Sequence, residues 1–113
     1  MKKILFVCSA NKQRSKTADD YFSNKYPLIE FKSAGTNHKI CNKEGTTPLT
    51  KDLIDWADTV FLMEQKHLKI VKSYLSKKDS RKMRVLDIPD DYKYYQSELL
   101  DLLDRKINFE TYL

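Results

Sequence analysis

Residues 4–15 read ILFVCSANKQRS, and this stretch decides the fold. Its first four residues are a continuous apolar run, which is typical of a strand buried on both faces of a sheet. Residues 9–15 are polar, and helix-forming sequence then runs from about residue 16 to residue 26, where Pro27 ends it. A buried strand, a polar loop and a helix in this order predict the start of a β-α-β unit with a parallel sheet.

The rest of the chain continues the alternation of strands and helices. The run at residues 60–63 is again fully apolar, which predicts a central strand, whereas residues 28–33 alternate as an edge strand does. With right-handed crossovers, we expect an α/β three-layer sandwich whose four-stranded parallel sheet has the order 2-1-3-4. A ligand then binds at the carboxyl end of strand 1. The other predicted elements are a strand at 83–88, helices at 50–57, 65–76 and 99–107, and loops at 34–48 and 89–95.

Length and composition limit the class of protein. A chain of 113 residues, 33% charged and 41% hydrophobic, predicts a single domain over residues 1–113. Its apolar runs are far shorter than the ~20 residues of a membrane span, and shorter than a signal peptide requires, so we expect no membrane partner and a cytoplasmic protein. The only cysteines, Cys8 and Cys41, form neither a secreted disulfide scaffold nor a zinc site.

The charge is unevenly distributed. Residues 1–86 hold 18 basic and 9 acidic side chains, which favours anionic partners for that part of the chain. The densest basic stretch, residues 77–84, has no interleaved aromatic residue, so a solvated helix end and loop is favoured over a nucleic-acid site. His38 and His67 are far apart in the sequence, and we expect both to be surface residues.

The loop after strand 1 carries the chemistry. Cys8 and Arg14 are separated by five residues and followed by Ser15, a C-x5-R-S pattern between a strand and a helix. Such a loop can curl around one tetrahedral oxyanion, with its backbone N–H groups and the helix N-terminus pointing inward. The planar guanidinium of Arg14 can bind two phosphate oxygens, and the positive surroundings favour a Cys8 thiolate placed to attack phosphorus. The predicted phosphate-binding residues are Ser9, Ala10, Asn11, Lys12, Gln13, Arg14 and Ser15.

The sequence resembles the low-molecular-weight protein tyrosine phosphatases, in particular a short bacterial branch. The loop CSANKQRS is similar to the C-x-x-N-x-x-R-S loop of that family. Three later segments also match in order: SAGT at residues 33–36, ADTVFLM at residues 57–63, and PDDY at residues 89–92, which resembles the P-D-P-Y acid loop. The resemblance covers nearly the whole chain and implies a phosphatase that acts on phosphotyrosine-type phosphomonoesters, on proteins or small molecules, through a cysteinyl-phosphate intermediate without a metal or cofactor.

The resemblance also implies roles for single residues. Cys8 becomes the nucleophile, Arg14 the phosphate clamp and Asp90 the general acid and then base. Ser15 donates to the thiolate, and Asn11 holds the shape of the loop. Lys12 at the rim and Tyr92 line the substrate pocket. Asp91 replaces the second proline of P-D-P-Y, so Asp91 stays an alternative acid.

Other functions stay open at this point. They are a phosphoarginine phosphatase or an arsenate reductase on the same fold, and a phosphate- or phosphopeptide-binding module without catalysis. Threonine is expected at the Lys12 position for phosphoarginine, and further cysteines beyond strand 3 are expected for arsenate reduction; the chain has neither.

Overall fold

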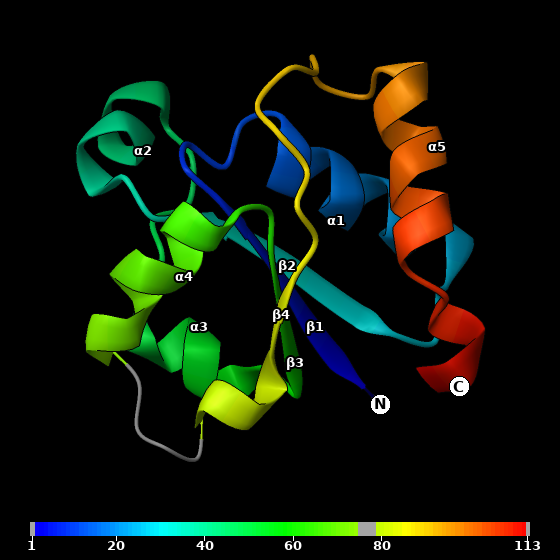
Figure 1. Cartoon of the computed structure of the whole chain (residues 1–113), viewed down its shortest axis with the longest axis horizontal. Helices are drawn as coiled ribbons and strands as arrows, with labels where there is room; N and C mark the ends of the chain where they lie inside the picture. Colours follow the sequence, from blue (N-terminus) through cyan, green and yellow to red (C-terminus); the bar gives the residue numbers. More distant parts are fainter. Residues whose placement is uncertain (1, 75–78, 113) are drawn as a thin grey trace.

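The computed structural model describes residues 2–74 and 79–112. Its centre is a four-stranded sheet in which neighbouring strands are parallel, in the predicted order β2-β1-β3-β4 (Figure 1). The strands are β1 (Lys3–Cys8), β2 (Glu30–Gly35), β3 (Thr59–Leu62) and β4 (Met83–Val85). The helices are α1 (Arg14–Lys25), α2 (His38–Glu44), α3 (Lys51–Trp56), α4 (Gln65–Val71) and α5 (Ser97–Lys106), with short 3-10 helices at Lys72–Tyr74, Asp79–Lys82 and Phe109–Tyr112.

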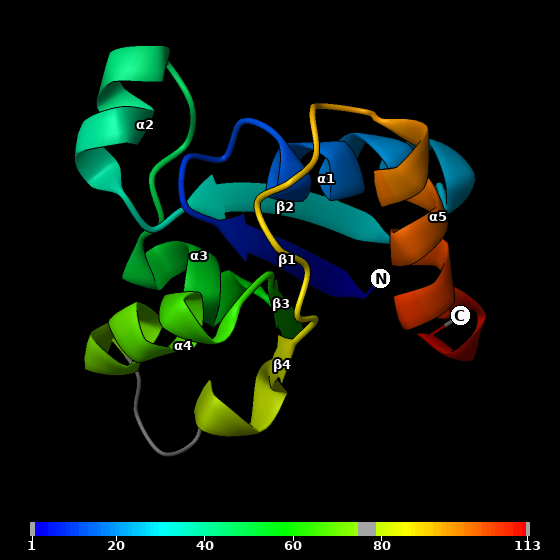
Figure 2. The same cartoon turned by 45° about the horizontal axis from the view of Figure 1, so that its top comes forward.

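Helices cover both faces of the sheet, which gives the expected three layers. Helices α1 and α5 lie on one face, and α3 and α4 lie on the other (Figure 2). The apolar residues 4–7 of β1 are fully buried in the middle of the sheet, whereas β2 is half exposed at the edge. All four strands end at the same side of the sheet, and the loop after β1 lies there.

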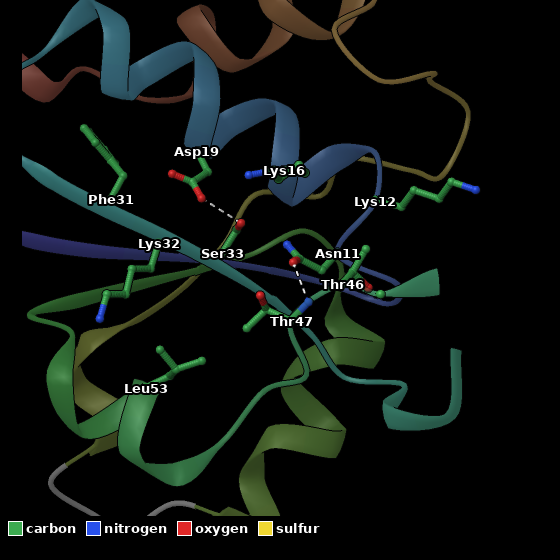
Figure 3. Close-up of a pocket in the computed structure, with 11 residues that line it drawn as sticks. Asn11, Lys12, Lys16, Asp19, Phe31, Lys32, Ser33, Thr46, Thr47 and Leu53 are labelled. Carbon is green, nitrogen blue, oxygen red and sulfur yellow. Dashed lines mark hydrogen bonds between the residues drawn. The ribbon is translucent and has the colours of Figure 1, made fainter. Parts of the chain in front are cut away.

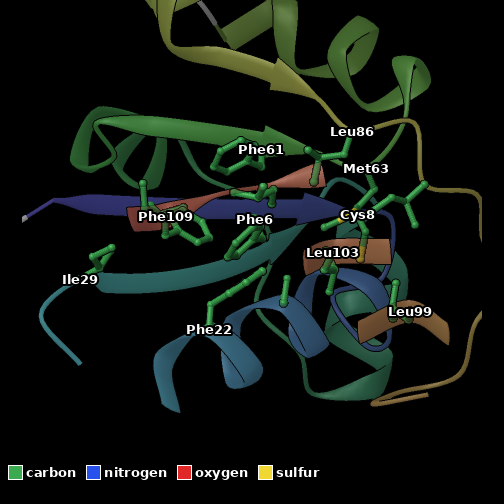
Figure 4. Packing of buried hydrophobic residues seen from close by; sticks show 14 residues of the cluster. Phe6, Cys8, Phe22, Ile29, Phe61, Met63, Leu86, Leu99, Leu103 and Phe109 are labelled. Carbon is green, nitrogen blue, oxygen red and sulfur yellow. The ribbon is translucent and has the colours of Figure 1, made fainter. Parts of the chain in front are cut away.

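An aromatic cluster fixes β1 beneath that loop. Phe6 stacks on Phe22 of α1 and Phe61 of β3 (Figure 4), and also on Phe31 of β2, with ring centroids 5.7–5.9 Å apart. Phe109 meets the Phe22 ring edge-on at 4.8 Å. Aromatic pairs of this kind contribute about 0.5–1.5 kcal/mol each beyond the area they bury. The strand that ends at Cys8 is therefore held from three sides.

Two predicted elements end earlier in the structure than the sequence indicated. Helix α4 stops at Val71 and continues as a 3-10 helix to Tyr74; residues 75–78, which include the predicted helix end, lie outside the described part of the chain. Strand β4 stops at Val85, although the N–H groups of Leu86 and Ile88 still donate to β3 and to Met63. The chain leaves the sheet plane at Asp87, whose φ is 55°.

The predicted loop 34–48 contains a helix. Helix α2 begins after Asn37, whose side chain accepts a hydrogen bond from the N–H of Ile40, and ends at Gly45, whose φ is 72°. Asn as the N-cap and glycine at the left-handed position after the helix are ordinary helix limits. The helix buries only Cys41, so no periodic apolar face marked it in the sequence.

One described residue of the basic stretch, Lys82, is less exposed than predicted, whereas Arg81 and Arg84 are exposed. Within its described part, residues 79–82 form a 3-10 helix and Arg84 belongs to β4. The Lys82 ammonium donates to the carbonyl oxygens of Ile54 and Ala57, the latter at 2.9 Å, so it caps the carboxyl end of α3. Lys77 and Lys78 lie outside the described residues.

Candidate active site

A small cavity lies inside the loop that joins β1 to α1. Cys8 is the last residue of β1 and Arg14 is the first residue of α1, so both ends of the C-x5-R pattern are fixed by secondary structure. The cavity holds about 140 Å³. It is lined by Cys8, Ser9, Ala10, Lys12, Gln13, Arg14 and Asp90. The structure thus brings Asp90, 82 positions after Cys8, to the same hollow.

Hydrogen bonds behind the cavity hold the Cys8 sulfur. Cys8 is 3% exposed, and its Sγ lies 2.9 Å from the Oγ of Ser15. The Asn11 amide donates to the same Ser15 oxygen at 2.9 Å. Because that oxygen already accepts from Asn11, its own hydrogen is free to be donated to the sulfur. A charge on Cys8 is therefore met by a hydroxyl donor fixed on the first turn of α1.

Asn11 gives the loop its curl. Its φ is 53°, in the left-handed region that asparagine tolerates better than most residues. Both polar atoms of its side chain form hydrogen bonds: the Nδ2 donates to Ser15, and the Oδ1 accepts from the N–H of Thr47 at 3.2 Å. Asn11 is 3% exposed and is not among the residues that line the cavity, and its side chain holds the shape of the loop.

The guanidinium of Arg14 is buried and held in a fixed orientation. Arg14 is 2% exposed, and its Nη1 donates to the Glu64 carboxylate and, at 2.9 Å, to the carbonyl oxygen of Ile88. The two Nη1 hydrogens are then used, and the edge formed by Nε and Nη2 keeps the geometry of a bidentate fork. Asp90 lies on this edge, with Oδ1 3.7 Å from Nε, and its side chain is 59% exposed.

Glu64 and His67 belong to this network and were not predicted from the sequence. His67 is fully buried, which makes the surface prediction wrong for it, whereas His38 is exposed as predicted. Its Nδ1 accepts from the N–H of Glu64 at 3.0 Å, so the proton lies on Nε2, which donates to Ser9 Oγ at 2.9 Å. Their position in the sequence could have indicated this role, because both residues follow β3 and therefore lie at the sheet edge that carries the Cys8 loop.

Glu64 and His67 both have shifted pKa values. Burial, and then the positive charge of Arg14, lower the pKa of His67 from 6.5 to about 4, so its ring is neutral near pH 7. Burial acts to raise the pKa of Glu64, but the hydrogen bond and the charge of Arg14 outweigh it and hold that pKa below its usual value. The network thus contains one cation, one anion and one neutral imidazole.

The segment around α2 supports the loop from the other side. The thiol of Cys41 lies 3.5 Å from the carbonyl oxygen of Ala10, and Thr46 donates to the same oxygen at 2.6 Å. Gly35 leaves the room for this packing, since a Cβ there would lie 2.5 Å from both the Cys41 sulfur and the Ser9 oxygen. The SAGT segment therefore needs its glycine for close approach.

The structure separates the remaining predicted residues. Asp91 is exposed, and it is not among the residues that line the cavity. Tyr92 is half-buried and packs against the core cluster beneath α1 and α5, so its place in a pocket wall stays a prediction. Lys12 lines the cavity at its rim, with its ammonium 3.3 Å from the Glu44 carboxylate.

Metal-binding and membrane-spanning features are absent from residues 2–74 and 79–112. These residues contain no group of three or more His, Cys, Asp or Glu side chains placed to hold a metal ion. None of their helices has the length and apolar character that crossing a membrane requires.

Solved structures with the same fold are numerous. The arginine phosphatase YwlE from Geobacillus stearothermophilus matches with a TM-score of 0.73 and 27% identity over 93% of this chain and 90% of that one. Wzb from Vibrio vulnificus, in complex with benzylphosphonate, matches with a TM-score of 0.76 and 21% identity over 93% of both chains. The tyrosine phosphatase Wzb from Escherichia coli K30, in complex with phosphate, matches with a TM-score of 0.72 and 20% identity over 93% and 92%.

In its fold and its phosphate-loop sequence, the chain is similar to the low-molecular-weight protein tyrosine phosphatases. Protein-family models and curated proteins gave no match, so the similarity rests on the structure together with the motifs. The chain has the strand order β2-β1-β3-β4 and the C-x5-R-S loop after β1.

Proposed function

We propose that this protein is a phosphatase that hydrolyses phosphotyrosine-type phosphomonoesters, on proteins or small molecules, through a cysteinyl-phosphate intermediate. The observation that carries the proposal is the 140 Å³ cavity, because Cys8, Arg14 and Asp90 all line this one hollow. A binding module needs the N–H groups and Arg14, but it does not need a thiol under the anion.

The first step forms a sulfur–phosphorus bond. The phosphate binds to the loop N–H groups and to the Nε–Nη2 edge of Arg14, which turns phosphorus toward the Cys8 thiolate below. The thiolate attacks in line as the bond from phosphorus to the phenolic oxygen breaks. Glu64 and Ile88 hold the guanidinium still during this step, since they occupy Nη1.

Asp90 completes both steps as a proton carrier. It lines the cavity from the loop 86–96 and gives its proton to the phenolate that leaves. In the second step it takes a proton from the water that attacks the phosphocysteine, which releases phosphate and restores the thiolate. The cavity supports Asp90 over Asp91 for this role, since only Asp90 lines it.

A phosphoarginine substrate is the second candidate, because the YwlE arginine phosphatase has 27% identity to this chain. Lys12 favours phosphotyrosine, because its ammonium at the cavity rim repels a guanidinium but not a phenyl ring. The whole chain of 113 residues then acts as one domain. Both cysteines are free thiols, and a thiolate nucleophile persists best in the reducing cytoplasm, where we place the enzyme.

The experiment compares two peptides that differ only in carrying phosphotyrosine or phosphoarginine, with the full chain and with Cys8→Ser. We expect phosphate release from phosphotyrosine, little from phosphoarginine, and none from either with Cys8→Ser. Faster release from phosphoarginine would replace the substrate in the proposal. Equal turnover by the wild type and Cys8→Ser would remove the covalent mechanism altogether.

A further inference from the structure

A second and larger groove lies beside the cavity, along the outer edge of β2 (Figure 3). It holds about 380 Å³, within the range of about 300–1,000 Å³ that is usual for ligand sites. Asn11 and Lys12 of the catalytic loop form one end of the groove, and Lys12 also lines the cavity. The two hollows are thus neighbours that share one side chain.

The catalytic cavity cannot hold a whole phosphopeptide. Its 140 Å³ is well below the about 300–1,000 Å³ of usual ligand sites, so residues next to the phosphorylated side chain must lie on the surface around the loop. The groove is a hollow of sufficient size beside that loop, and it begins at Lys12 on the cavity rim.

Lysines give the groove a positive character. Lys12, Lys16 and Lys32 line it, with Lys12 and Lys32 at opposite ends (Figure 3). Lys16 forms an exposed pair with Asp20 at 3.2 Å, and Lys32 lies 4.5 Å from the centre of the Trp56 ring. An exposed ion pair such as Lys16–Asp20 is weak, so Lys16 can bind a carboxylate of a ligand in place of Asp20.

One carboxylate lines the groove and is already engaged. Asp19 Oδ2 accepts a hydrogen bond from the Ser33 hydroxyl at 2.8 Å, and its Oδ1 accepts from Ser23 at 3.3 Å. Among the residues that line the groove, three cations therefore face one hydrogen-bonded anion.

The edge of β2 suits an extended chain. The N–H groups of Glu30 and Thr36 donate to the carbonyl oxygens of Lys2 and Cys8, so by alternation the main-chain groups of Phe31 and Ser33 face away from β1. The protein's own chain already pairs along this edge, because Gly35 donates to Thr47 at 2.9 Å. An extended peptide in the groove can use the same type of hydrogen bond.

From these observations we infer that the groove binds an acidic, extended segment of a phosphoprotein substrate, adjacent to its phosphorylated tyrosine. The inference rests on the proposed phosphatase function and adds a preference for Asp or Glu near the phosphorylation site. An exposed ion pair contributes about 1.4- to 5-fold in affinity, so Lys16 and Lys32 together account for about 2- to 25-fold.

The experiment uses the full chain and three substrates. Two are phosphotyrosyl peptides that are identical except that flanking Glu residues in one are Gln in the other, and the third is p-nitrophenyl phosphate. The variant is Lys16→Gln with Lys32→Gln. The matched control is Lys69→Gln, which removes an exposed lysine on α4 that does not line the groove.

We expect the wild type to prefer the acidic peptide in kcat/KM. The double variant loses about 2- to 25-fold on that peptide and nothing on the other two substrates, whereas Lys69→Gln changes none of the three. The preference also falls in high salt, where the Debye length shrinks from about 10 Å at 0.1 M to about 3 Å at 1 M.

Two outcomes overturn the inference while the phosphatase function stands. One is equal cleavage of both peptides by a wild type that hydrolyses p-nitrophenyl phosphate. The other is an equal loss on the acidic peptide in Lys69→Gln, which would assign the effect to net charge. A wild type without p-nitrophenyl phosphate turnover overturns the proposed function, and the groove inference with it.

Discussion

The buried imidazole of His67 makes the stability of this protein dependent on pH. In the folded state the ring is neutral, since burial and the charge of Arg14 lower its pKa to about 4. In the unfolded chain the pKa returns to about 6.5. Between these values the unfolded state takes up a proton that the folded state does not, so the free energy of unfolding falls as the pH falls. Each pH unit in this interval is worth about 1.4 kcal/mol, which gives about 3 kcal/mol in total.

The assay is urea unfolding at about pH 7.5 and about pH 4.5. His67→Gln removes the titrating ring while an amide can still donate to Ser9. We expect the wild type to lose about 2–3 kcal/mol more than His67→Gln between the two pH values. His38→Gln is the control, because it removes a histidine that is exposed rather than buried. An equal pH dependence in the wild type and His67→Gln would refute a neutral, buried His67.

Three further changes test the loop and the acid. Arg14→Lys loses the bidentate fork, and each lost charge-assisted hydrogen bond of about 1.5–3 kcal/mol costs about 10- to 150-fold in kcat/KM; unchanged kinetics would remove Arg14 from the site. Asp90→Asn slows phosphotyrosine hydrolysis by about 10²–10⁴-fold. It slows p-nitrophenyl phosphate hydrolysis less, because nitrophenolate leaves without a proton donor. A larger loss that depends on the leaving group in the same way in Asp91→Asn would make Asp91 the general acid. In urea unfolding, the free energy of unfolding of Asn11→Ala is lower than that of Asn11→Gly by about 1–2 kcal/mol, because only alanine is strained at a φ of 53°. Equal free energies of unfolding would argue against that strain.

The sheet and the catalytic loop were predictable because their signals are local. Residues 4–7 and 60–63 are apolar without interruption, and both strands are buried at the centre of the sheet. The change from that apolar run to polar residues and then to a helix marks the loop. Cys8 and Arg14 therefore stand at the two ends of this loop. The edge position of β2 followed from its alternating side chains.

The network behind the loop was not predictable because its partners are distant in sequence. Arg14 and Glu64 are 50 positions apart, and Ser9 and His67 are 58 apart. His67 is flanked by polar residues in the sequence, which is the context of a surface residue. Only the fold buries its ring and lets it donate to the loop. Helix α2 was missed for a related reason: its limits, Asn37 and Gly45, are local signals, but its single buried residue gives no periodic face.

The covalent intermediate on Cys8 is the central claim, and trapping it is the most direct test. The full chain and Cys8→Ser are mixed separately with p-nitrophenyl phosphate, quenched within the first turnovers and digested under conditions that preserve phosphocysteine. We expect a burst of nitrophenolate from the wild type and a peptide that carries one phosphoryl group on Cys8, with neither signal in Cys8→Ser. Steady turnover without any phosphorylated Cys8 peptide, or turnover that persists in Cys8→Ser, would contradict it.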